Sequence, residues 1–203
     1  MSAIMSRQSS ALPLIAIGGV CGLAWASGLR GFMAELAGTD SSVEWYGTFV
    51  QVLLPGMLIG VLFGWAEHLR RSGGRRGWRW LGAAPLLFPI AVFVSPEVIN
   101  AVFAGQPLFS GGIGGGAIAV PLLGMAGGYA LSGRGPLWSR ITLGAVALTP
   151  IPAWPLASML FGPEFALTTP RGAWVALLFY SFIATLAFAC AIPHLRVGTR
   201  AHT

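Results

Sequence analysis

Two ionisable residues lie near the end of the first long apolar stretch, in the segment LRGFMAELAG. Arg30 and Glu35 are five positions apart, so on a helix they occupy different faces and are not expected to pair with each other. A charge at membrane depth is costly unless it is paired. We therefore expect each to have a partner elsewhere, with Glu97 or Glu164 as partners for Arg30 and Glu44 as a further member.

Convergence of these groups would create an acidic vestibule at the outer face, which would concentrate cations or bind a zwitterionic solute. The alternative reading places all of them in the lipid headgroup zone, where charge costs little. The candidate ligand- or ion-binding residues are Arg30, Glu35, Glu44, Glu97, Glu164 and Arg171.

The segment WAEHLRR offers a second set of polar groups. Glu67 and Arg71 are spaced as a helical i,i+4 ion pair. His68 and His194 could approach each other, but their spacing matches no metalloprotease pattern such as H-E-x-x-H. The sequence contains no G-x-S-x-G and no paired Asp motif, and Asp40 is its only aspartate. We expect no metal, no cofactor and no catalytic site, so an enzyme is the least favoured class.

The glycine-rich stretch SGGIGGGAIAVP formally fits a dinucleotide fingerprint through Gly112, Gly114 and Ala117. That motif has meaning only between a strand and a helix, and no lysine follows to hold a phosphate. A pore filter of backbone carbonyls stays open as an alternative.

The wider glycine spacing favours helix packing instead. Glycines recur every four residues, which lets two helix backbones approach closely in hydrocarbon. The expected helix-packing residues are Gly56, Gly60, Gly64, Gly112, Gly116, Gly124 and Gly128. The helix that they face belongs either to this chain or to another subunit.

The composition of the chain indicates that membrane-spanning helices carry these residues. Only 9% of the 203 residues are charged, 55% are hydrophobic, and the mean hydropathy is +0.75. A soluble domain is close to one-quarter charged. The charge-free run 45–66 would extend about 33 Å as a helix, close to the thickness of a bilayer's hydrocarbon core. We expect an all-α, single-domain bundle of about six transmembrane helices. The expected membrane-spanning ranges are 11–33, 46–66, 80–95, 109–131, 138–161 and 172–193.

The distribution of charge predicts the orientation. The net charge is +6, and all twelve lysine-or-arginine positions are arginine, which is typical of a GC-rich bacterial genome. With the N-terminus in the cytoplasm, all arginines but Arg30 and Arg171 fall inside and all acids but Glu67 fall outside. Both termini are therefore expected in the cytoplasm, with the chain in a bacterial inner membrane. The residues expected to contact lipid headgroups, rather than nucleic acid, are Arg70, Arg71, Arg75, Arg76 and Arg79.

Several prolines fall within each of two predicted helices: Pro85 and Pro89 in 80–95, and the three prolines of TPIPAWP, at 149–155, in 138–161. The backbone carbonyls that they free need another donor, and Thr149, Trp154 and Ser158 are available. Such a broken helix lines a cavity in many transporters, although a static kink explains it equally well.

These features favour a transport or channel module for a small solute or ion. The alternative is a non-catalytic membrane subunit or assembly factor that docks through its glycine-rich faces. Expected partners are membrane lipids, with either a second copy of the chain or another membrane subunit.

Overall fold

The computed structural model describes residues 10–105 and 113–195, which form helices, turns and short loops without any strand. The first helix, α1 (Ala11–Ala37), begins where the Ser10 side chain accepts a hydrogen bond from the Leu12 N–H. It ends at Gly38, whose φ of 57° places the backbone in the left-handed region that glycine tolerates. A single 3₁₀ turn, η1 (Gly38–Asp40), follows.

The second long helix has a wide π-helical first part, η2 (Trp45–Leu53), that continues into α2 (Leu54–Arg71). Pro55 explains the change, because it has no N–H and its ring would clash with the Gln51 carbonyl in a regular α-helix. A wider turn before the proline avoids that clash.

The third helical segment is short and irregular. It consists of the 3₁₀ helix η3 (Trp78–Leu86), with Pro85 inside it, and of α3 (Leu87–Phe93). A separate helix, α4 (Pro96–Phe103), then follows. The sequence predicted a single membrane-spanning segment over 80–95, interrupted by Pro85 and Pro89, and did not predict α4.

The second half of the chain begins with α5 (Ile113–Leu131). The predicted helix 138–161 is two helices, α6 (Leu137–Leu148) and α7 (Pro150–Phe161), separated at Thr149 because Pro150 cannot continue the hydrogen-bond ladder. A 3₁₀ turn, η4 (Pro163–Phe165), leads to α8 (Pro170–Ala191) and the final turn η5 (Ile192–His194).

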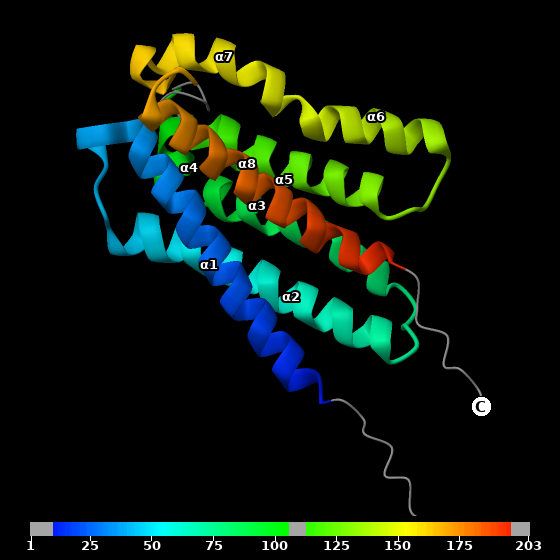
Figure 1. The fold of residues 1–203 in the computed structure, drawn as a ribbon. Helices are drawn as coiled ribbons and strands as arrows, with labels where there is room; N and C mark the ends of the chain where they lie inside the picture. The colour runs from blue at the N-terminus through cyan, green and yellow to red at the C-terminus, as the bar shows by residue number, and fades with distance from the viewer. Residues whose placement is uncertain (1–9, 106–112, 196–203) are drawn as a thin grey trace, which may run out of the picture.

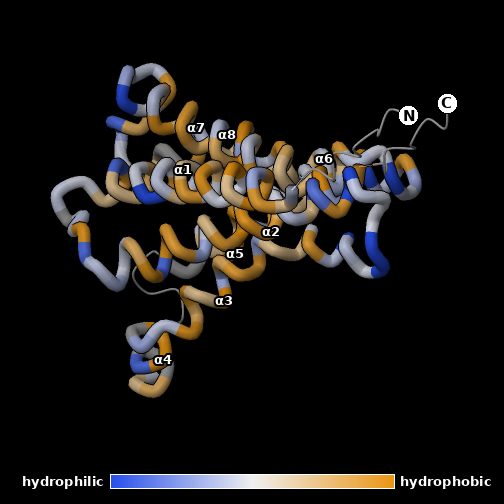
Figure 2. Tube along the Cα trace, turned by 90° about the horizontal axis from the view of Figure 1, so that it is seen from below, coloured by the Kyte–Doolittle hydropathy of each residue, from blue (hydrophilic) through white to orange (hydrophobic). Residues whose placement is uncertain are grey.

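The helices run back and forth between two ends of the molecule, and α1 begins at the end where α8 finishes (Figure 1). Hydrophilic segments gather at both ends, with mainly hydrophobic chain between them, while α4 extends to one side (Figure 2). The arginine-rich end contains Arg70, Arg71, Arg75, Arg76 and Arg79. The acidic end contains Glu35, Glu44 and Glu164 together with Arg30 and Arg171.

Three helices are long and apolar enough to cross a membrane: Ala11–Ala37, Trp45–Arg71 and Pro170–His194. Shorter apolar helices cover Trp78–Phe93 and Gly115–Leu131. The sequence predicted about six membrane-spanning helices. Fewer reach full length among the described residues, because prolines shorten the third segment and divide the α6–α7 segment, and because the described part of the predicted helix 109–131 begins at Ile113.

Aromatic side chains form much of the core between α1, α7 and α8. The Phe32 ring stacks on Phe179 at 5.1 Å and meets Phe182 edge-on at 5.2 Å between centroids. Trp154 of α7 lies 5.7 Å from Phe179. This cluster fixes the positions of α1, α7 and α8 close to the acidic end.

Candidate functional site

Arg30 is held by the segment that joins α1 to η2. Its guanidinium donates to the Ser41 hydroxyl at 3.2 Å, to the Thr48 hydroxyl at 3.4 Å and to the Ser42 carbonyl. Thr48 is buried on η2, so this contact ties α1 to the start of the second helix. Among the described side chains, no carboxylate lies within ion-pair distance of Arg30, so the expected pairing with Glu164 is not formed.

Arg171 forms a second, separate contact at the acidic end. It lies 3.5 Å from the Glu35 carboxylate, donates to the Glu35 carbonyl at 3.0 Å, and sits over the Phe165 ring at 5.1 Å. It thereby connects the start of α8 to the end of α1. The side chains of Arg171 and Glu35 are 46% and 43% exposed, so water screens this pair.

The side chains of Glu44 and Glu164 take part in neither of these two contacts. Glu44 is exposed and accepts a hydrogen bond from the Ser42 hydroxyl at 3.2 Å, and Glu164 is exposed on η4. Glu97 lies in α4, which extends away from the other helices in Figure 2, and its side chain is outside what the structure describes. The six candidate vestibule residues therefore share one end of the molecule but divide into separate groups.

The glycines of α2 pack against α1. A Cβ added at Gly56 would meet the Ala26 Cβ, one at Gly60 would meet the Gly18 carbonyl, and one at Gly64 would meet the Leu14 carbonyl. Gly18 and Gly22 are the matching positions on α1, where a Cβ would meet the Gly60 and Gly56 carbonyls. Only glycine permits this backbone separation.

The glycines of α5 divide into two groups. Gly124 and Gly128 face Leu186 and Cys190 of α8, and Gly127, which the four-residue spacing missed, faces Ala187. No described residue lies within 4 Å of a Cβ placed at Gly116, so the expectation that Gly116 packs against another helix of this chain is not met. Gly112 lies outside the described residues.

The backbone carbonyls that lose a helical donor at Pro150 and Pro155 accept hydrogen bonds from neighbouring side chains. The Val146 carbonyl loses its usual helical donor at Pro150, and it accepts instead from the Thr149 hydroxyl at 2.7 Å and from the Thr149 N–H at 3.1 Å. Trp154 was expected to act in the same way, but its indole donates to the Phe165 carbonyl at 3.2 Å. The side chain of Ser158 lies outside what the structure describes. Tyr180 of α8, which sequence analysis missed, donates to the Ile151 carbonyl at 3.3 Å.

At the arginine-rich end, Glu67 accepts from Arg70 at 2.7 Å and from Arg71 at 2.6 Å. The i,i+4 pair predicted from the sequence is therefore part of a three-residue cluster. His194 lies against Gly82 of η3 and its ring is 6.2 Å from Tyr129. No group of three or more His, Cys, Asp and Glu within residues 10–105 and 113–195 is arranged to hold a metal ion.

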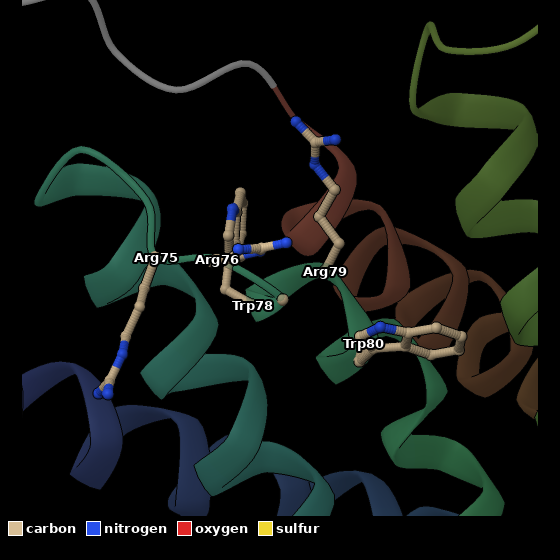
Figure 3. Close-up of a pocket in the computed structure, with 6 residues that line it drawn as sticks. Arg75, Arg76, Trp78, Arg79 and Trp80 are labelled. Atoms are coloured by element: carbon tan, nitrogen blue, oxygen red, sulfur yellow. The ribbon is translucent and has the colours of Figure 1, made fainter.

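A surface pocket of about 560 Å³ lies at the start of η3. Gly77, with a φ of 82°, turns the chain into η3 there. In Figure 3 the Arg75 side chain points away from those of Arg76, Trp78 and Arg79. Trp78 is buried, while Trp80 is exposed. The pocket is lined by Arg75, Arg76, Gly77, Trp78, Arg79 and Trp80, a set without a carboxylate. Guanidinium groups beside indole rings suit an anionic group at a membrane interface.

Comparison with known proteins gives no relative to guide the function: no protein-family model, curated protein or solved structure matches this chain.

Proposed function

We propose that this chain is a multi-pass protein of a bacterial inner membrane, with about six membrane-crossing segments and both termini in the cytoplasm. The three long apolar helices support a membrane location. The segments η3–α3, α5 and α6–α7 supply the other crossings in this proposal. The start of α1 and the end of α8 lie at the arginine-rich end, which the excess of positive charge assigns to the cytoplasm (Figure 1).

Within that topology, we propose a non-catalytic role as a subunit or assembly factor of a larger membrane complex. One observation supports this choice: Arg30, Glu35 and Arg171, three of the six residues that suggested a solute pathway, form contacts within the chain, as does one of the carbonyls freed by proline. Arg30 binds the η1–η2 segment, Arg171 binds Glu35, and the Ile151 carbonyl accepts from Tyr180. Groups engaged in this way hold helices in position. They are not available to take the place of the water molecules that a solute loses when it binds.

The docking surface differs from the one expected from the sequence. Gly56, Gly60 and Gly64 are occupied by α1, so they are not available to a partner helix. Helix α6 is the better candidate, because none of its residues is buried and its contacts are chiefly with α5. Its exposed residues include the small Thr142 and Ala145 beside Ile141, and small residues permit close helix approach.

Photocross-linking tests this surface. A benzophenone amino acid at Ile141, which is 62% exposed on α6, should give one discrete protein adduct in membranes of the source cells. The matched control is Leu177, which is 63% exposed on α8 and should give only lipid adducts. Lipid adducts alone at both positions would overturn the docking role of α6.

A transport or channel module for a small solute or ion is the second candidate. The exposed carboxylates of Glu44 and Glu164 favour it, since they leave negative charge at the acidic end. Purified protein in liposomes would then show flux that the double change Glu44→Gln and Glu164→Gln reduces at least about tenfold. Flux of that kind would replace the subunit proposal, and its absence across monovalent cations, divalent cations and zwitterionic amino acids would exclude this candidate.

A further inference from the structure

A groove of about 230 Å³ lies between α1, α2 and α8, away from the acidic end. Its α1 wall includes Ile17, Cys21 and Trp25, and its α8 wall includes Thr185 and Ala189. Close contact between the glycines of α1 and α2 forms its floor. The small side chains of Cys21 and Ala189 leave the space between the walls open.

The groove walls offer almost no free hydrogen-bond donor to a ligand. The two wall residues that carry a polar hydrogen on nitrogen or oxygen both donate it to the backbone of α8. Trp25 donates from its indole to the Phe182 carbonyl at 2.8 Å, and Thr185 donates from its hydroxyl to the Ser181 carbonyl at 2.8 Å. A ligand in this groove therefore meets mainly hydrocarbon and ring surfaces.

The length of the groove matches one leaflet of a bilayer. Its lining runs from Trp25 to Leu14 on α1 and from Gly56 to Glu67 on α2. Each of these stretches advances about 16 Å along its helix. The hydrocarbon core of a bilayer is about 30 Å thick, so one leaflet supplies about half of that. The groove thus fits the depth of an acyl chain that enters from the arginine-rich end.

The charge at that end is positive. Glu67 lines the end of the groove, and its single carboxylate is shared by Arg70 and Arg71. One negative and two positive groups leave an excess of positive charge, and the Arg71 side chain is 53% exposed. An anionic headgroup complements this cluster, whereas a neutral headgroup gains less from it.

We propose that this groove binds one acyl chain of an anionic phospholipid, whose headgroup lies against Arg70 and Arg71. The lipid comes from the leaflet at the arginine-rich end and packs into the α1–α2–α8 interface. This role is independent of the proposed docking by α6, since it uses other helices and another ligand.

Native mass spectrometry of the detergent-purified chain tests the proposal with two probes, phosphatidylglycerol and phosphatidylethanolamine of identical chains. The wild type should retain one phosphatidylglycerol with about a tenfold preference over phosphatidylethanolamine, which corresponds to about 1.4 kcal/mol. Equal retention of the two lipids would overturn the assignment of an anionic headgroup. Displacement by inorganic phosphate would overturn the role of the groove, because phosphate has no acyl chain.

Two tryptophan variants on α8 test the position of the acyl chain. Thr185→Trp fills the groove and should reduce retention at least about tenfold, while Ala184→Trp, at an exposed neighbour outside the lining, should leave it unchanged. Cys21→Phe fills the groove from the α1 wall and should act like Thr185→Trp, which covers the case that one variant fails to fold. Undiminished retention in a folded groove-filling variant would overturn the proposal.

A pair of arginine variants tests the position of the headgroup. Arg71→Gln should reduce the preference for phosphatidylglycerol, whereas Arg79→Gln, in the pocket at the start of η3, should preserve it. The reverse result would move the headgroup to that pocket and contradict the site at Arg70 and Arg71.

Discussion

The hydroxyl of Tyr180 on α8 donates a hydrogen bond to the backbone carbonyl of Ile151 on α7 at 3.3 Å. This carbonyl is the one that Pro155 leaves without its usual helical donor four residues later. A side chain of one helix therefore completes the backbone hydrogen bonding of another. The contact connects α7 to α8.

Removal of this hydroxyl should destabilise the bundle. Tyr180→Phe leaves the Ile151 carbonyl unsatisfied, which we expect to lower the free energy of unfolding by about 1–3 kcal/mol. Unfolding by SDS in mixed micelles, followed by tryptophan fluorescence, measures this change. The Pro155→Ala background restores a backbone N–H at position 155, so Tyr180→Phe should cost less there. An equal cost in both backgrounds would show that the hydroxyl does not serve this carbonyl.

Close packing of α1 on α2 makes a second prediction. Gly60→Ala places a methyl group against the Gly18 carbonyl and within 2.8 Å of the Gly22 Cα, so we expect a loss of about 1–3 kcal/mol in stability. Gly28→Ala is the matched control on α1, since no described atom lies within 4 Å of the added methyl group. It should be neutral or slightly stabilising because alanine favours helix. The same SDS titration compares them, and similar effects of the two changes would argue against a glycine interface.

The two arginines at the acidic end, Arg30 and Arg171, should differ in their effect on stability. Arg171→Gln removes a half-exposed ion pair, one hydrogen bond to the Glu35 carbonyl and a contact over the Phe165 ring, and it should cost about 0.5–1.5 kcal/mol because water screens the pair. Arg30→Gln removes hydrogen bonds from a charged group to Ser41, Ser42 and Thr48 and should cost about 1.5–3 kcal/mol. Melting temperatures in one detergent rank the two variants. A larger loss for Arg171→Gln would contradict the structural role assigned to Arg30.

Sequence periodicity identifies features that depend on near neighbours along one helix. The four-residue spacing of Gly56, Gly60 and Gly64 marks the face that packs on α1, and the i,i+4 spacing marks Glu67 and Arg71. The density of prolines at 149–155 marks the division between α6 and α7. Each of these follows from helix geometry alone.

Contacts between distant segments could not be predicted in the same way. Nothing in the sequence links Tyr180 to Ile151, or Arg171 to Glu35, because helix order and tilt determine which residues meet. The serines at 41 and 42 gave no signal as partners for Arg30, since sequence reasoning searched for a carboxylate. Helix α4 was missed because its eight residues are short of any membrane-spanning length.

Topology is tested most directly by cysteine accessibility in cells. Cys21 and Cys190 are first replaced by alanine. A single cysteine is then placed either at Ser72, in the turn after α2, or at Thr168, just before α8. Both positions are exposed. We predict that a membrane-impermeant maleimide labels Thr168→Cys in intact cells and labels Ser72→Cys only after permeabilisation. Labelling of Ser72→Cys in intact cells would contradict a cytoplasmic arginine-rich end, and recovery of the chain in solution without detergent would contradict the membrane location itself.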